Sequence, residues 1–262
     1  MTRPFFAPRT WARARAALEA TERTLLVVLD LDGTIAPIAK RPDLARVPAS
    51  TLRWIARAVR GVKTRIAVLS ARPGSDLTRL VPVRGVVRIG QYGLDGALAP
   101  PARVRSRLRR RCRRVGEALR PLVRAVPGAL LESKGMTVAV HCRGVRGEAR
   151  RRRLLAGLFD IASGEAGRQG FQTVPGDLVV DFVPRGHDKG RALRALRARI
   201  KPRAIFYFGD SDGDEPAFSA LTKRDFPVRV GRKPTRAPYR VMGIEGVARF
   251  LEAVAACRAG TT

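Results

Sequence analysis

The chain alternates short continuous apolar runs with longer segments in which apolar residues recur every three or four positions. Continuous runs predict strands that are buried on both faces, and the wider spacing predicts amphipathic helices. In the first hundred residues the pattern predicts strands over 25–29, 65–70 and 86–89, and helices over 10–21, 48–59 and 76–80. Strands that alternate with helices in this way are typical of a doubly wound α/β fold with a parallel sheet.

The middle of the chain shows a different pattern, which starts after Pro100 and Pro101. Two arginine-dense helical stripes alternate there with two pairs of strand-like segments, in the order 104–126, 129–132 with 137–141, 147–163, and 171–174 with 178–183. Helix–hairpin–helix–hairpin is an α+β pattern with an internal near-repeat. It indicates a small domain that is separate from the α/β part.

The α/β pattern then resumes, with strands expected over 204–208 and 226–230 and a last helix over 245–256. We therefore expect two domains. Residues 1–101 and 186–262 would form a Rossmann-like α/β core with a parallel sheet, and residues 102–185 would form an inserted α+β cap.

The net charge of +30, from 52 Lys and Arg against 22 Asp and Glu, raises the question of polyanion binding. Arginine greatly outnumbers lysine, and the arginines are spread along the whole chain, mostly on the polar faces of the expected helices. This distribution favours a solvated basic surface over a specific nucleic-acid partner. Non-specific adhesion to nucleic acid at low salt is still expected.

Three further features bear on where the chain works. No apolar run reaches the length of about 18 residues that a membrane-spanning helix needs. The first twenty residues lack the continuous apolar segment of a secretory signal. Cys112, Cys142 and Cys257 are scattered and form no C-x-x-C pair, which fits a reducing compartment better than a disulfide framework. We expect a cytoplasmic protein with no membrane partner that acts as a monomer.

Two carboxylates end the first predicted strand. Asp30 and Asp32 follow the apolar run 25–29, and Gly33 comes next. Residues two apart on an extended backbone point to the same side, so these carboxylates face one spot and repel unless a cation or a proton lies between them. The carboxyl end of a parallel strand is also where open α/β sheets bind ligands. The pattern indicates a Mg²⁺ site with a nucleophilic aspartate, and an Asp-rich βα turn is the alternative.

Three more groups are expected at the same edge of the sheet: Ser70 after the second strand, Lys189 at a helix start, and the acidic cluster 210–215. Each has an ordinary interpretation, as a helix cap, a surface lysine and a turn stabilised by a helix dipole. Together they suit phosphoryl transfer, which needs carboxylate ligands for Mg²⁺, groups that offset phosphate charge and an in-line nucleophile. Asp30 would attack phosphorus, and Asp32 would protonate the leaving oxygen and then deprotonate water.

These motifs resemble a known superfamily. D-x-D-G-T at 30–34, Ser70, Lys189 and G-D-x-x-x-D at 209–214 are similar, in order and spacing, to the four motifs of the haloacid-dehalogenase superfamily. The insert resembles the cap of its sugar-phosphatase branch. Within that branch the chain is most similar to the trehalose-phosphatase family, through L-S-A-R at 69–72, Q-Y-G-L-D at 91–95 and D-F-V-P at 181–184. The resemblance implies Mg²⁺-dependent hydrolysis of trehalose 6-phosphate through an aspartyl-phosphate.

The resemblance also assigns roles to residues. The catalytic residues it implies are Asp30, Asp32, Ser70 and Lys189. The metal ligands are Asp30, Asp210, Asp214 and Asp32, the last through its backbone carbonyl. The substrate-binding residues are Gly33, Ser70, Ala71, Arg72 and, on the cap, Glu132, Lys134, Arg143 and Asp181. For Glu132 and Lys134 the alternative is the exposed face of a strand.

Several positions depart from the usual family pattern. The family usually has His, Glu, Tyr and Glu where this chain has Tyr92, Asp95, Cys142 and Asp181. Because such positions bear on the sugar, the first alternative is the same chemistry on another sugar phosphate, such as a sucrose or glycosylglycerate phosphate. A sugar phosphomutase or phosphotransferase is a second alternative, and an inactive scaffold that binds nucleic acid is a third.

Overall fold

The computed structural model describes residues 2–259, which divide into two compact units. The larger unit combines the chain up to Leu98 with the chain from Lys189 onward, and the smaller unit is Ala99–Asp188. The expected insert, 102–185, lies within the smaller unit. Each unit has its own sheet and its own hydrophobic core.

The sheet of the larger unit has eight strands in the order β1-β12-β11-β10-β2-β3-β4-β5. All neighbouring pairs are parallel except β4 and β5, which form an antiparallel hairpin. The strands span Arg3–Pro4, Leu25–Leu29, Thr64–Leu69, Val87–Gly90 and Asp95–Gly96 for β1 to β5, and Ala204–Gly209, Phe226–Val230 and Tyr239–Val241 for β10 to β12. The predicted α/β class is confirmed.

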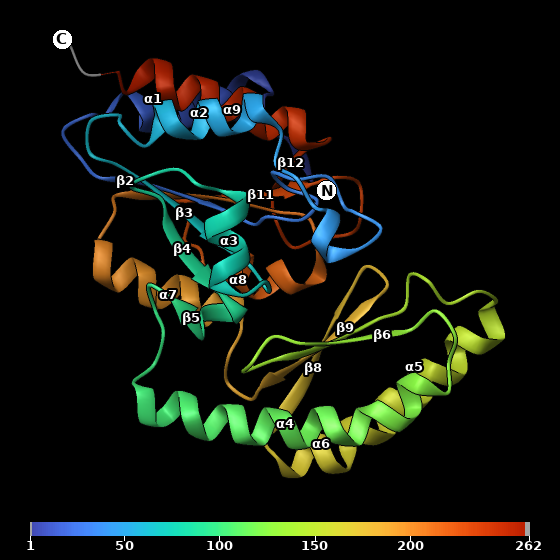
Figure 1. The fold of residues 1–262 in the computed structure, drawn as a ribbon. Helices are drawn as coiled ribbons and strands as arrows, with labels where there is room; N and C mark the ends of the chain where they lie inside the picture. The colour runs from blue at the N-terminus through green and yellow to red at the C-terminus, as the bar shows by residue number, and fades with distance from the viewer. Residues whose placement is uncertain (1, 260–262) are drawn as a thin grey trace. The chain divides into compact units, whose positions relative to one another are not determined.

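Helices cover both faces of this sheet (Figure 1). One face packs on α1, α2 and α9, which span Pro8–Glu19, Ala49–Ala58 and Ile244–Cys257. The other packs on α7, Lys189–Ile200, and α8, Glu215–Ser219. The sequence of strand β2 is continuously apolar because both faces of the strand are buried. Val27 and Leu29 join one core, while Leu26 and Val28 join the other.

The smaller unit packs helices on one face of an antiparallel sheet with strand order β6-β7-β9-β8. Strands β6 to β9 are, in chain order, Leu130–Ser133, Val138–His141, Phe171–Gly176 and Val179–Pro184, and helices α4 to α6 are Ala102–Arg124, Glu148–Ser163 and Glu165–Arg168. Helix α4 buries Leu108, Cys112, Val115 and Leu119, a spacing that keeps one apolar stripe. Alternation in the strands places Glu132 and Asp181 on the other face of the sheet, on either side of Ala139.

The pattern missed the shortest elements. Strands β1 and β12, with two and three residues, and helix α6, with four, are too short to show a period. Three 3₁₀ turns were missed for the same reason: η1 at Pro42–Leu44, η2 at Gln91–Gly93 and η3 at Asp212–Asp214. Helix α3, Gly74–Leu80, begins two residues before its predicted start. Over the described residues no helix has the length and apolarity to cross a membrane. The three cysteines are free thiols.

Candidate active site

The topology of the large sheet gathers polar groups at the carboxyl ends of its central strands. Asp30 directly follows β2, Ser70 follows β3 and Asp210 follows β10. Strand β2 lies between β3 and β10 and pairs with both in parallel, so these ends share one edge. Lys189 reaches the same place because it is the first residue of α7 and its side chain is buried.

Lys189 lies between two carboxylates. Its Nζ is 2.8 Å from Asp30 Oδ1 and 2.7 Å from Asp214 Oδ1. Burial lowers the pKa of the Lys189 ammonium, but the charges of Asp214 and Asp30 outweigh burial and the pKa is raised. Lys189 is therefore a permanent cation that holds the Asp30 carboxylate in place.

Asp214 is in turn fixed by several donors. The Tyr207 hydroxyl donates to Oδ1 at 2.8 Å, while the backbone N–H and the hydroxyl of Ser211 donate to Oδ2 at 3.0 and 2.8 Å. Burial raises the pKa of Asp214, but the charge and hydrogen bond of Lys189 more than offset this, so the pKa is lowered. Burial and the charge of Asp214 raise the pKa of Tyr207, which keeps its hydroxyl a donor.

Three carboxylates form a group that is able to hold a metal ion. One oxygen each from Asp30, Asp210 and Asp214 lie within 4.8 Å of one another. Burial, with the charge of Asp214 adding to it, raises the pKa of Asp210 to about 6. Burial also raises the pKa of Asp30 well above its usual value, against the opposing charge of Lys189. One ammonium does not balance two buried carboxylates and a third that is partly buried, and a divalent cation with a preference for oxygen ligands fits here.

Gly33 allows Asp210 to reach this group. Its backbone is in the left-handed region, with φ +79°, and a β-carbon at this position would lie 2.0 Å from Asp210 Oδ2. Any other residue would therefore displace the Asp210 carboxylate as well as strain the turn. This is a physical reason for glycine after the two aspartates.

The Asp32 carboxylate is not part of the three-carboxylate group but binds Arg72. The Arg72 guanidinium donates from Nε to Oδ2 at 2.7 Å and from Nη2 to Oδ1 at 2.8 Å. It also donates to Asp76 at 3.1 Å and to the Pro42 carbonyl at 2.9 Å. Burial lowers the pKa of Arg72, but the hydrogen bonds that Arg72 donates to Asp32, together with the charge of Asp32, outweigh burial and raise the pKa.

Ser70 and Ala71 belong to the same turn. The Ser70 side chain is buried, and its Oγ accepts a hydrogen bond from the backbone N–H of Arg72 at 3.2 Å. Ala71 is partly exposed. The hydroxyl of Ser70 thus fixes the backbone that aims Arg72 at Asp32.

The expected cap residues lie on the smaller unit, where they form pairs. Lys134 Nζ is 2.7 Å from Asp181 Oδ1, with both side chains buried, and His141 Nε2 is 2.7 Å from Glu132 Oε2. Strands β6, β7 and β9 bring these groups to the sheet face opposite the unit's core. Arg143 lies apart from them, with its Nη2 bonded to the carbonyl and the carboxylate of Asp177.

Sequence reasoning did not single out three residues that the structure places at the large-sheet edge. Tyr207 and Ser211 hold Asp214, and the buried Arg229 donates to the Ser211 carbonyl at 2.9 Å. A polar residue within an otherwise apolar strand could have indicated two of them, since Tyr207 interrupts strand β10 and Arg229 interrupts strand β11. Asp95, one of the departures from the family pattern, accepts from the Gly74 N–H at 2.7 Å and so caps α3.

The comparison with known families decides the affiliation of this chain. The family model described as trehalose-phosphatase matches residues 28–244, which include every residue of the candidate site described above. The chain belongs to the trehalose-phosphatase family. The match covers the large-sheet edge and the complete smaller unit.

Two similar proteins differ in how much of their own length this chain covers. The trehalose-6-phosphate phosphatase of Escherichia coli is 28% identical over 238 residues, which cover 86% of this chain and 84% of that protein. The bifunctional trehalose-6-phosphate synthase/phosphatase of Thermoproteus tenax is 26% identical over 238 residues, 89% of this chain. The chain spans only about a third of that protein (32%).

Solved structures support the fold of this trehalose-phosphatase family member. The C-terminal domain of a trehalose-6-phosphate phosphatase from C. albicans matches with TM-score 0.79 and 18% identity, over 98% of both chains. A trehalose-6-phosphate phosphatase related protein matches with TM-score 0.73 and 23% identity, over 88% of this chain and 97% of that one. The main sheet with a separate small antiparallel sheet is the fold of the haloacid-dehalogenase superfamily.

Proposed function

We propose that this protein hydrolyses trehalose 6-phosphate to trehalose and inorganic phosphate, with Asp30 as the nucleophile. The observation that carries the proposal is the buried set in which Lys189 holds Asp30 and Asp214 next to Asp210. Membership of the trehalose-phosphatase family supports the substrate. The arrangement suits phosphoryl transfer, in which positioning and charge neutralisation do most of the work.

Asp30 carries the first half of the reaction. Lys189 engages Oδ1, so the attack on phosphorus falls to Oδ2. A bond forms between Oδ2 and phosphorus while the bond from phosphorus to the sugar oxygen breaks, and Asp32 gives a proton to that oxygen. In the second half Asp32 takes a proton from water, whose oxygen attacks phosphorus and releases phosphate and the Asp30 carboxylate.

We propose that Arg72 releases Asp32 during the reaction. Both oxygens of Asp32 accept hydrogen bonds from Arg72, and breaking one of these bonds would free a carboxyl oxygen to exchange a proton with the substrate. We propose that the released guanidinium binds the phosphate of the substrate, since its fork matches phosphate oxygens as well as it matches a carboxylate. The backbone of Gly33 and Ala71 and the Ser70 hydroxyl would contribute further donors.

We propose Mg²⁺ as the resident ion. Asp30, Asp210 and Asp214 would hold it, together with the backbone carbonyl of Asp32. When bound, Mg²⁺ supplies positive charge against the phosphate oxygens. Asp214 would also orient Lys189, since its Oδ1 accepts a hydrogen bond from the Lys189 ammonium.

The paired groups on the small sheet are proposed to recognise the sugar. Charged side chains make strong hydrogen bonds to hydroxyl groups, and Glu132, Lys134 and Asp181 are held in fixed positions by their pairs. Arg143 is proposed to add charge near the phosphate or the sugar of the substrate. In this proposal the smaller unit acts as the cap that selects the phosphate ester.

A panel of phosphate esters tests the function. Phosphate release is measured with Mg²⁺ for trehalose 6-phosphate, sucrose 6-phosphate, a glycosylglycerate phosphate and glucose 6-phosphate, with Asp30→Asn as the blank. We expect kcat/KM to be highest for trehalose 6-phosphate, by roughly tenfold or more. A clearly higher kcat/KM for another ester would overturn the substrate. Phosphate transfer to added sugar in place of release would overturn the hydrolase.

A further inference from the structure

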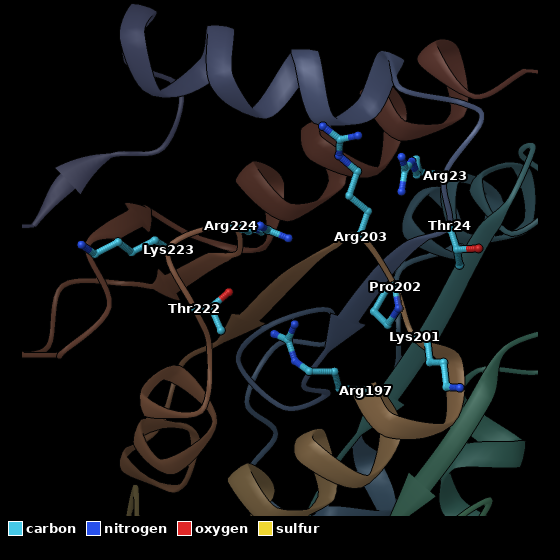
Figure 2. Close-up of a pocket in the computed structure, with 9 residues that line it drawn as sticks. All are labelled: Arg23, Thr24, Arg197, Lys201, Pro202, Arg203, Thr222, Lys223 and Arg224. Carbon is cyan, nitrogen blue, oxygen red and sulfur yellow. The ribbon is translucent and has the colours of Figure 1, made fainter.

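A basic cavity lies at the amino ends of the strands of the large sheet, at the edge opposite the candidate active site. It has a volume of about 670 Å³, and its lining residues precede three strands: Thr24 before β2, Arg203 before β10 and Arg224 before β11 (Figure 2). The catalytic groups follow the opposite ends of β2 and β10. A six-residue strand such as β10 is roughly 20 Å long, so the cavity is separate from the active site.

The lining of this cavity is strongly cationic. Six of its residues are basic, namely Arg23, Arg197, Lys201, Arg203, Lys223 and Arg224. Two carboxylates reach this set, because Asp225 accepts from Arg197 and Glu22 lies 3.8 Å from Arg203. No other carboxylate within residues 2–259 forms an ion pair with any of the six. The cavity therefore has a large excess of positive charge.

The backbone that carries these cations is held in place. Arg13 donates to the carbonyls of Lys223 and Asp225 at 3.1 and 3.2 Å. Arg258 donates to the Arg23 carbonyl at 2.9 Å. The Asp225 carboxylate also accepts from the Thr222 hydroxyl at 2.8 Å, which ties the loop before β11 to α7 through Arg197. The backbone segments that carry the cations therefore lose little freedom when a ligand binds.

Lys201 enters the cavity lining from the turn that ends α7. It directly follows α7 in the left-handed region, with φ +51°, and its N–H donates to the Arg197 carbonyl at 2.8 Å. This hydrogen bond fixes the backbone from which the Lys201 side chain leaves the helix.

We propose that this cavity binds a small polyanion that carries two or more phosphate groups. Guanidinium and ammonium groups on separate segments can bind several phosphate oxygens at once. The volume lies within the range of small-molecule sites. A pocket lined by cations from a few short segments suits a compact polyphosphate ligand better than a nucleic acid, which needs a groove that follows an extended backbone.

Calorimetric titration of the full chain with sodium tripolyphosphate, in buffer without Mg²⁺, tests this proposal. The cavity variant is Lys201→Gln/Lys223→Gln/Arg224→Gln. The matched control is Arg103→Gln/Arg107→Gln/Arg110→Gln, which removes the same charge from exposed positions of α4. We expect the wild type and the control to bind alike, and the Kd of the cavity variant to rise at least about tenfold. Circular dichroism checks that both variants fold.

Three results would overturn the proposal. The first is no binding of tripolyphosphate by the wild type, and the second is an equal loss of affinity in the cavity variant and the control. The third is unchanged affinity in the cavity variant, which would place the anion at the active site or on the general surface. A labelled single-stranded oligonucleotide serves as a further probe. If the cavity variant loses affinity for the oligonucleotide but keeps its affinity for tripolyphosphate, the ligand is a nucleic acid and the small polyanion is excluded.

Discussion

Arg72 makes two parallel hydrogen bonds to Asp32, at 2.7 and 2.8 Å, across 40 residues of sequence. The fork of a guanidinium fits both oxygens of a carboxylate, and a lysine ammonium does not. Arg72 thereby fixes the carboxyl that is proposed to move the proton. It is also the group proposed to take over the substrate phosphate.

Arg72→Lys tests this pairing. The variant keeps the charge but loses the fork, so we expect kcat/KM for trehalose 6-phosphate to fall roughly tenfold or more. Arg79→Lys is the matched control, because Arg79 lies in α3, the helix that follows Arg72, and also pairs with Asp76, at 3.4 Å. Equal activity of the two variants would contradict the proposed role.

Gly33→Ala tests the close approach of Asp210. The added β-carbon would meet the Asp210 carboxylate, so we expect the apparent Mg²⁺ affinity in phosphate-release assays to fall about tenfold or more. Gly231→Ala controls for backbone strain alone, since Gly231 also has a positive φ, +89°, but a β-carbon added there would meet nothing within 4 Å. If both variants need the same Mg²⁺ concentration, contact with Asp210 is not what requires glycine.

Tyr207→Phe tests the support of Asp214. The variant removes one donor to a buried carboxylate, which costs about 1.5–3 kcal/mol of unfolding free energy. We also expect kcat to fall several-fold, because Asp214 orients Lys189. Tyr239→Phe on strand β12 should change the unfolding free energy by less than about 0.5 kcal/mol. Urea denaturation and phosphate release measure both quantities, and a Tyr207→Phe protein as stable and active as Tyr239→Phe would refute the role.

Asp181→Asn tests sugar recognition. The substitution removes the charge that pairs with Lys134, so we expect KM for trehalose 6-phosphate to rise about tenfold. Hydrolysis of p-nitrophenyl phosphate, which has no sugar, should stay unchanged. Asp177→Asn, which removes the partner of Arg143, is the control in the same unit. An equal loss on both esters for Asp181→Asn would argue for a general structural role.

The fold class was predictable because its central strands are buried on both faces. Strand β2 reads as five apolar residues in a row, and the parallel pairing of such strands sends Asp30 and Asp210 to one edge. The end strands were not predictable. Strand β1 consists of Arg3 and Pro4, and its pairing with β12 depends on tertiary contacts that leave no periodic signal.

Partners of the site residues could be predicted less well than their positions. Strand alternation tells which face a side chain takes, but it does not tell which donor will meet it. The bond from Tyr207 to Asp214 and the pair of Lys134 with Asp181 depend on turns and registers that only the folded chain sets. Arg143 illustrates the limit, since the structure places it against Asp177, apart from the two pairs proposed to recognise the sugar.

The central claim is that Asp30 is the nucleophile of a trehalose 6-phosphate phosphatase. The most direct measurement is Mg²⁺-dependent phosphate release from trehalose 6-phosphate by the wild type, by Asp30→Asn, and by the control Asp160→Asn at an exposed position of α5. We predict that Asp30→Asn lowers kcat by about 10⁴-fold or more while Asp160→Asn leaves it unchanged. An Asp30→Asn protein that folds normally and keeps a tenth or more of the wild-type rate would contradict the account.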